Sequence, residues 1–203
     1  MFEFGRVRFR AVEREDLTLL HGWENDSELI MFSRSKPLNF ASAVQLEKQY
    51  EEWMKDEREL HFIVELADSK EAIGTARLRR QDWGNVRTVD FGTYIGKKEL
   101  WGKGLGRQIT VALLEMAFNQ FNAEQCQTWS VEYNRRAHKS LEACGFKKGG
   151  TVRQTVFVNG RRWDSYYFDI LRDEYLNIRL DLLKQTLGEK AEEYIRKNGA
   201  IEV

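Results

Sequence analysis

The sequence predicts a single mixed α/β domain, and three observations support this fold class. The length of 203 residues suits one well-buried domain and is short for two. Strand-like runs at 61–66, 72–80 and 88–96 are separated by turn-like segments, which favours an antiparallel meander. A glycine-rich stretch follows and leads into a strongly helical segment. We therefore expect a mostly antiparallel sheet covered by helices.

The N-terminal part contains one predicted strand and two predicted helices. Alternating apolar residues over 6–12 indicate a half-buried strand. Residues 15–25 fit a short helix, and residues 39–57 fit a longer helix with Asn39 as its N-cap. These elements come before the meander.

The second half continues with a helix over 107–121 and a strand over 126–133. A helix over 134–144 follows, and Gly145 is its expected C-terminal cap. Residues 151–172 read as a hairpin that turns at the Asn-Gly pair 159–160, because this dipeptide favours the tight turn of a two-residue hairpin loop.

The tail is predicted to be helical with a break at Gly188, and we divide the chain into a domain at 1–172 and a helical extension at 173–203. Four leucines of the extension recur at spacings of four and three, which gives one apolar stripe. They are Leu176, Leu180, Leu183 and Leu187. Such a stripe covers either the core of the domain or a second subunit, so a homodimer is possible.

The composition excludes several classes of protein. The 32 basic residues balance the 32 acidic ones, so the overall charge favours neither nucleic acid nor a membrane surface. The two cysteines form no disulfide framework and lack metal-ligand spacing. The N-terminus does not resemble a signal peptide, and no segment approaches the roughly 20 apolar residues of a membrane helix. We expect a soluble, cytoplasmic protein without a bound metal.

The stretch ELWGKGLGRQ (99–108) places three glycines at alternate positions before a helix. It fails the P-loop spacing, and its third glycine comes one position early for the dinucleotide fingerprint. The arrangement suits an anion that faces the N-terminal amides of the helix, with Lys103 and Arg107 adding positive charge. The alternative is a flexible connection into the helix.

Two motifs connect this stretch to a known family. WGKGLG resembles the acetyl-CoA pyrophosphate loop of the GNAT N-acetyltransferase superfamily, Gln/Arg-x-x-Gly-x-Gly/Ala, with Trp101 at the Gln/Arg position. Trp at that position is familiar in the branch that includes ribosomal-protein N-terminal acetyltransferases. Downstream, NRRAHKSLEACGF is similar to the family motif N-x-x-A-x-x-x-Y-E-x-x-G-F. The matching positions are Asn134, Ala137, Glu142, Gly145 and Phe146. The resemblance covers roughly residues 6 to 172.

The resemblance implies a GNAT fold, in which about seven strands, flanked by about four helices, splay between the fourth (89–96) and the fifth (126–133). It implies acetyl-CoA as co-substrate, with the pantetheine arm between these two strands and Asn134 holding the arm on the far side. Main-chain bonds to the arm are expected from Tyr94, Ile95 and Gly96. Amides expected on the pyrophosphate are those of Trp101, Gly102, Lys103, Gly104, Leu105, Gly106 and Arg107.

The implied chemistry is attack by a neutral amine on a thioester. Because an alkylammonium titrates near ~10, a base or a water chain must take its proton. Asp90 is our candidate base, since its strand parity opposes that of the apolar residues; Glu132 and Glu65 are rivals. Each carboxylate has an alternative reading as a solvated or ion-paired acid. Gly92, in mid-strand, predicts either a β-bulge with a free N–H at the thioester carbonyl or a packing glycine.

Leu141 stands where the family has the tyrosine that protonates the leaving thiolate, and leucine cannot donate a proton. His138 and Tyr133 are candidate substitutes. Alternatively no side-chain acid is needed, because a thiol with a pKa near ~8.5 leaves tolerably as thiolate. Cys144 is expected to be a packing residue.

We therefore expect an N-acetyltransferase that moves acetyl from acetyl-CoA to a primary amine by direct attack in a ternary complex. The acceptor is the N-terminal amine of a peptide or protein, or a small amine such as a polyamine or amino sugar; similarity to the ribosomal-protein branch favours a peptide. The runner-up, motivated by Leu141, is a catalytically silent acyl-CoA-binding module. A nucleotide-binding protein is a third, weaker reading.

Overall fold

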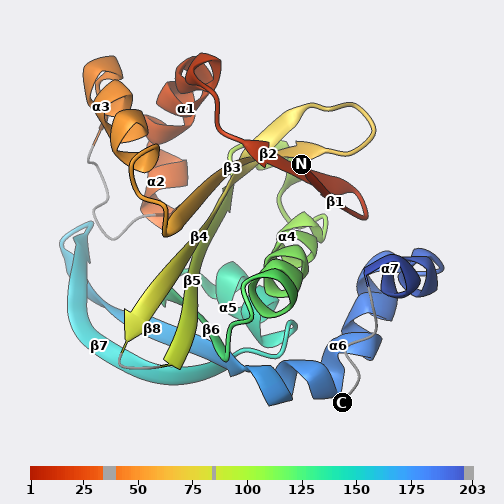
Figure 1. Ribbon diagram of the computed structural model, residues 1–203. Helices are drawn as coiled ribbons and strands as arrows, with labels where there is room; N and C mark the ends of the chain where they lie inside the picture. Colours follow the sequence, from red (N-terminus) through yellow and green to blue (C-terminus); the bar gives the residue numbers. More distant parts are fainter. Residues whose placement is uncertain (34–39, 84–85, 199–203) are drawn as a thin grey trace.

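The computed structural model describes residues 1–33, 40–83 and 86–198 (Figure 1). Within these ranges eight strands form one sheet in the order β1-β2-β3-β4-β5-β6-β8-β7. The strands are β1 (Phe2–Phe4), β2 (Val7–Ala11), β3 (Glu59–Leu66), β4 (Ala72–Trp83), β5 (Val86–Ile95), β6 (Gln125–Val131), β7 (Lys147–Val158) and β8 (Arg161–Leu171). The predicted mixed α/β class is confirmed, with the short β1 as an additional strand.

Adjacent strands pair antiparallel except β5 and β6, which are parallel. The β5–β6 pairing is short, because only residues 88–90 of β5 face residues 125–127 of β6. Beyond that point the two strands separate, as Figure 1 shows. They are the predicted fourth and fifth strands, so the predicted splay is confirmed. Because the additional strand β1 precedes them, they are numbered β5 and β6.

The β7–β8 hairpin turns where predicted. Asn159 and Gly160 have φ values of 52° and 73°, and Val158 pairs with Arg161 on either side of them. Positive φ at both central residues of a two-residue loop is the geometry that Asn-Gly favours. β7 forms one edge of the sheet and β1 the other, and the β7–β8 pairing has register shifts between residues 148 and 150 and between residues 152 and 156.

Seven α-helices lie within the described residues: α1 (Leu17–Glu24), α2 (Ser27–Ser33), α3 (Ala43–Trp53), α4 (Leu105–Glu115), α5 (Arg135–Glu142), α6 (Arg172–Leu187) and α7 (Lys190–Asn198). Single 3-10 turns, η1 (Arg14–Asp16) and η2 (Lys98–Leu100), precede α1 and follow β5, and α4 continues into a π-helical turn, η3 (Met116–Gln120). The resemblance implied about four helices and a helical extension. The structure has more helices than this, because α2 lies between α1 and α3 and the extension divides into α6 and α7.

The predicted long helix over 39–57 is shorter in the structure. α3 begins after Ser42, whose hydroxyl accepts a hydrogen bond from the Gln45 amide at 3.2 Å. Asn39, the predicted N-cap, lies outside the described residues. The helix ends at Trp53 because the chain must turn before β3, and the Glu59 amide donates to the Asp56 carbonyl in that turn.

Two apolar clusters cover opposite faces of the sheet. The larger joins alternate residues of the strands to α4, α5, α6 and α7, with Val89 and Phe91 of β5 on this face. The smaller lies under α1, α2 and α3 and includes Trp23, with Tyr94 of β5 packed against it. Alternate residues of β5 therefore face different helical layers.

The tail forms α6 and α7, and the break predicted at Gly188 is confirmed, with φ 60° and ψ −133°. The predicted leucine stripe is partly wrong, because Leu180 is 50% exposed. The buried side of α6 includes Tyr175 and Arg179 in place of that leucine, since it faces a buried carboxylate of α4. The division of the chain at residue 172 stays a prediction. Every described helix is too short or too polar to span a lipid bilayer.

Candidate functional site

The glycine loop before α4 has a backbone that only glycine adopts readily. Gly102 and Gly104 have φ values of 75° and 78°, in the left-handed region that penalises a Cβ. A Cβ on Gly102 would meet nothing within 4 Å. The conformation, and not crowding by neighbouring protein atoms, therefore requires glycine here.

The first turn of α4 presents free amides. Gly104 is the N-cap and has no side chain to accept from them, and the first turn carries no acidic residue. The Gln108 amide is the first to be bonded within the helix, to the Gly104 carbonyl at 3.2 Å. The amides of Leu105, Gly106 and Arg107 therefore lack intrahelical acceptors and, with the helix dipole, suit an anion.

The cations around this loop are arranged differently from expectation. The Arg107 guanidinium donates to Gln185 Oε1 of α6 at 2.6 Å. The carbonyl of Lys103 accepts from Arg6 Nη2 at 3.0 Å, which brings a third positive charge to the loop. Arg136, at the start of α5, lies 4.0 Å from the centre of the Trp101 ring. Basic side chains from three parts of the chain thus contact or adjoin the glycine loop.

The separation of β5 from β6 leaves main-chain groups unpaired. The Gly96 amide donates to the Ile73 carbonyl at 2.8 Å, so alternate residues of β5 are bonded to β4. By this alternation Thr93 and Ile95 direct their main-chain groups away from β4. We call the space between residues 92–95 of β5 and residues 129–131 of β6 the strand gap, and its closed end the fork.

Side chains donate hydrogen bonds to β5 carbonyls at both ends of the strand gap. At the fork, Thr128 Oγ1 donates to the Phe91 carbonyl at 2.8 Å. At the open end, Trp101 Nε1 donates to the Ile95 carbonyl at 2.8 Å. Between them remain the amide and carbonyl of Thr93 and the amide of Ile95, which form a short polar edge for an extended ligand.

This geometry corrects two details of the sequence interpretation. Of the three residues expected to bond the pantetheine arm, only Ile95 directs its amide to the strand gap; Tyr94 and Gly96 are in the alternation that bonds β4. Gly96 instead makes room for a ring, because a Cβ there would lie 2.3 Å from the Trp23 indole. The predicted bulge at Gly92 is wrong, since Gly92 pairs with Arg77 in regular register.

Asp90 lies at the fork. Its side chain is on the same face of β5 as that of Tyr94, which packs against Trp23 of α1. Asp90 is 7% exposed, and its carboxylate accepts a hydrogen bond from Arg77 Nη2. Burial raises the pKa of this carboxyl, and the Arg77 guanidinium opposes the rise. Arg77 also donates to Glu59 Oε1 at 3.0 Å, so one guanidinium joins two carboxylates.

The two rival carboxylates occupy other places. Glu65 lies at the opposite end of the sheet, where Arg8 and Arg10 each hold it at 2.7 Å. These ion pairs explain the presence of a buried carboxylate at Glu65 without a catalytic role. Glu132 follows β6, and its Oε2 accepts the Asp164 amide at 3.2 Å. Of the three, Asp90 is the one that lies on the strand at the fork.

His138 and Leu141 lie on the face of α5 that packs against the sheet. His138 Nε2 is 3.0 Å from the Val131 carbonyl, and the ring packs against Tyr166 and Phe168. Partial burial lowers the pKa of the imidazole, which favours its neutral form. Leu141 is buried in the large apolar cluster. It contributes packing where the family has a phenol.

Asn134 and Tyr133 hold α2 across the end of β6. Asn134 Oδ1 caps α5 by accepting the Ala137 amide at 3.3 Å, and its Nδ2 donates to the Phe32 carbonyl at 3.0 Å. The Tyr133 hydroxyl donates to the Met31 carbonyl at 2.6 Å. Both side chains thus satisfy main-chain groups, including carbonyls of the last turn of α2.

Neither cysteine has the surroundings of a nucleophile. Cys126 and Cys144 are free and buried. Burial raises the pKa of the Cys144 thiol to about 12, which disfavours a thiolate. Among the described residues no group of three or more His, Cys, Asp or Glu side chains is placed to hold a metal ion.

Sequence reasoning missed Thr128, Ser130 and Arg77. A signal for the first two was present, because alternation from the buried Cys126 places both hydroxyl residues at core-facing positions. Polar side chains at such positions need partners. Arg77 carried no local signal, since its partners Glu59 and Asp90 come from two other strands.

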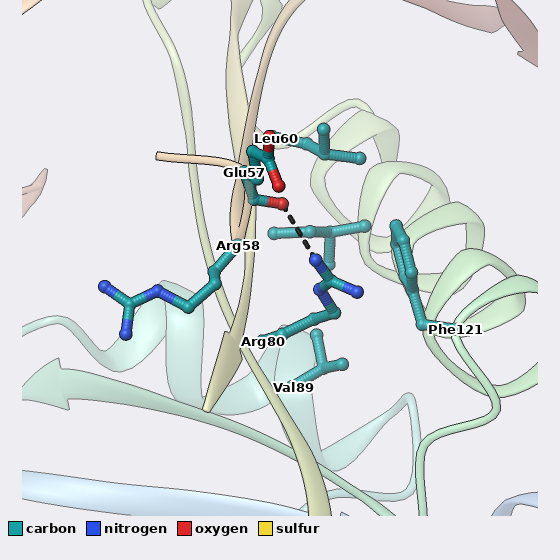
Figure 2. Close-up of a pocket in the computed structure, with 7 residues that line it drawn as sticks. Glu57, Arg58, Leu60, Arg80, Val89 and Phe121 are labelled. Atoms are coloured by element: carbon teal, nitrogen blue, oxygen red, sulfur yellow. Dashed lines mark hydrogen bonds between the residues drawn. The ribbon is translucent and has the colours of Figure 1, made fainter. Parts of the chain in front are cut away.

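A small pocket at the other end of the meander does not include any predicted site residue. Figure 2 shows it beside Arg80, whose Nη2 donates to the Glu57 carbonyl at 2.9 Å. Its lining residues are Glu57, Arg58, Leu60, Leu78, Arg80, Val89 and Phe121. It therefore lies apart from the loop and the strand gap.

Comparison with known proteins agrees with this geometry. Residues 6–147 match the family model described as an acetyltransferase (GNAT) domain. Spermidine N(1)-acetyltransferase of Vibrio cholerae is 30% identical over 172 residues, covering 85% of this chain and 96% of the relative. Its crystal structure with CoA and spermine has a TM-score of 0.76 and covers 85% of this chain and 99% of that chain at 30% identity. A dodecameric structure of the same enzyme has a TM-score of 0.71, also at 30% identity, and covers 85% of this chain and 97% of that chain.

Proposed function

Since the chain belongs to the GNAT family and is an acetyl-CoA-dependent N-acetyltransferase, we propose that it transfers acetyl to a primary amine of a polyamine. The observation that carries this proposal is the similarity to a spermidine acetyltransferase over 96% of that relative's length. The family match over residues 6–147 includes the N-terminal helices α1, α2 and α3, which we infer to contact the acceptor.

We place acetyl-CoA by the two features that suit it. The pyrophosphate fits the amides of Leu105, Gly106 and Arg107, where the left-handed glycines keep Cβ atoms away. The arm fits the strand gap, because Thr93 and Ile95 offer it an unpaired strand edge. The loop follows the open end of the gap, so an arm that starts there runs toward the fork. The thioester therefore lies near Phe91 and Thr128.

The amine approaches from the face that carries Asp90. Gly92 has no side chain, and a Cβ there would reach only the Arg77 guanidinium, at 3.6 Å. The strand is therefore open beside the thioester. Asp90, directly or through water, takes a proton from the amine while the amine nitrogen attacks the carbonyl carbon of the thioester. The C–N bond forms, the C–S bond breaks, and its electron pair leaves on the CoA sulfur.

Thiol release from acetyl-CoA tests the acceptor. Spermidine, an N-terminal alanine peptide and an amino sugar antibiotic are compared at equal concentrations. We expect kcat/KM for spermidine to exceed that for the peptide by at least about a hundredfold, a difference of about 3 kcal/mol in barrier. A preference for the peptide contradicts the polyamine proposal and leaves the enzyme class intact. CoA binding without turnover of any amine favours the silent acyl-CoA-binding module.

We also infer that the chain self-associates. This inference rests on the dodecameric neighbour and on the exposed apolar residues of the β7–β8 hairpin, where Phe157 is 65% and Tyr167 47% exposed. Light scattering on the purified chain measures its mass directly. A monomer at micromolar concentration contradicts the inference.

A further inference from the structure

Ser130 of β6 carries a hydroxyl that is buried and has no hydrogen-bond partner in the described structure. The residue is 7% exposed, and its Oγ is inaccessible to solvent. Buried polar side chains in native proteins nearly always have a partner, so an orphaned hydroxyl points to a group that is absent from the protein alone. Ser165 of β8 makes the contrast: it is also 7% exposed, but its hydroxyl lies 2.6 Å from Thr155 Oγ1.

The position of Ser130 is the fork of the strand gap. Thr128, two residues earlier on the same face of β6, donates to the Phe91 carbonyl and so joins the two strands just beyond their last paired residues. Ser130 is thus the first residue of this face beyond the closure. Across the sheet it pairs with Tyr166, against whose ring His138 of α5 packs at 5.4 Å.

The same region lacks the phenol on which the family relies. Leu141 lies one turn after His138 on α5 and is 6% exposed within the apolar cluster. Leucine has no group that can donate to a departing sulfur, and the His138 Nε2 lies 3.0 Å from the Val131 carbonyl. The Ser130 hydroxyl is a donor on the neighbouring strand, and it lies at the end of the strand gap toward which an arm from the loop runs.

We propose that Ser130 donates a hydrogen bond to the CoA sulfur as the C–S bond breaks. This proposal rests on the function proposed above, which places the thioester at the fork. The nitrogen–carbon bond forms, the C–S electron pair moves to sulfur, and the Ser130 O–H stabilises the developing thiolate. The serine keeps its proton, and solvent protonates the released thiolate. Ser130 is then a catalytic residue that takes over part of the role of the missing tyrosine.

A binding experiment tests the contact without turnover. Calorimetry compares the affinities for CoA and for desulfo-CoA, which lacks the sulfur atom, in the wild type, Ser130→Ala and Ser165→Ala. We expect the wild type to prefer CoA by about fivefold, the size of one hydrogen bond. Ser130→Ala should lose this preference, and Ser165→Ala should keep it. An unchanged preference in Ser130→Ala overturns the proposal.

Turnover and stability complete the test. Ser130→Ala should lower kcat by about tenfold to a hundredfold and leave KM for acetyl-CoA within about twofold, because the contact strengthens as charge develops on sulfur. Its urea midpoint should not fall below that of the wild type, since the substitution removes an orphaned group. Ser130→Cys, with a weaker donor, serves if the alanine variant does not fold. A wild-type kcat in both variants overturns the proposal. If the wild type acetylates no amine, the proposed function fails, and the CoA comparison still reports on Ser130.

Discussion

Arg179 of α6 donates two hydrogen bonds to the carboxylate of Glu115 of α4, from Nε to Oε1 at 2.7 Å and from Nη2 to Oε2 at 2.8 Å. Both residues are buried, at 7% and 1% exposure, and the Tyr175 hydroxyl donates to the same carboxylate. The C-terminal extension is therefore attached to the helix that carries the glycine loop at its N-terminus.

Arg179→Met should destabilise the protein by about 3–5 kcal/mol, because it leaves the Glu115 carboxylate buried without its cation. Urea unfolding measures the change. The matched control is Lys197→Met, which removes the exposed pair between Lys197 and Glu193 and should cost less than about 1 kcal/mol. An equal, small effect of both variants would show that the buried pair adds no stability.

Gly104→Ala should weaken CoA binding by about tenfold, since it strains or displaces the amides that we propose bind the pyrophosphate. It should also cost about 1–2 kcal/mol in stability, because φ is 78°. Gly160→Ala is the control, with φ 73° and open space around its Cβ, but far from the loop in the β7–β8 turn. It should cost similar stability and leave CoA affinity unchanged. Normal CoA binding in folded Gly104→Ala removes the loop from the site.

Asp90→Asn should lower turnover by about 10²–10⁴-fold at neutral pH and leave the CoA dissociation constant unchanged, because it removes basicity and keeps shape. The loss should shrink as pH rises, since more of the amine is then neutral without help. Glu132→Gln is the comparison and should retain turnover. Wild-type turnover of Asp90→Asn over the whole pH range would make Asp90 structural and Glu132 or a water chain the better candidate.

The ionised Glu59 carboxylate should make the free energy of unfolding depend on pH. The nearby His61 Nε2, 3.3 Å from Glu59 Oε1, and the pair with Arg77 lower the pKa of the carboxyl from 4.5 to about 2. A lowered pKa stabilises the folded state above pH 4.5, and this contribution is lost as the pH falls toward 2. Glu59→Gln should therefore cost about 1–3 kcal/mol at neutral pH and progressively less in acid.

Urea unfolding at neutral and acidic pH measures the difference between Glu59→Gln and the wild type. Glu52→Gln is the control, because this carboxylate is 73% exposed and pairs with the exposed Lys55. It should show no comparable pH dependence. A Glu59→Gln deficit that stays constant from neutral pH to pH 2 would contradict the ion-pair explanation.

The sequence by itself determined the features that depend on local backbone geometry. Left-handed φ at Gly102 and Gly104, the turn at Asn159 and Gly160 and the end of α6 at Gly188 each follow from what one or two residues permit. Because the two family motifs are built on such local requirements, the family, the cofactor and the order of elements could be predicted from them.

Only the tertiary structure decided which main-chain and side-chain groups were left for the ligand. Pairing of β5 with β6 ends after Asp90, Gly96 is bonded to β4, and the Ser130 hydroxyl has no partner among the residues that the structure describes. Each of these facts depends on contacts between segments far apart in the chain, and no local pattern records whether a donor has met an acceptor. The same reason explains the error at Leu180. The helical spacing of the leucines predicted that it is buried, but α6 turns Arg179 toward Glu115 and leaves Leu180 exposed.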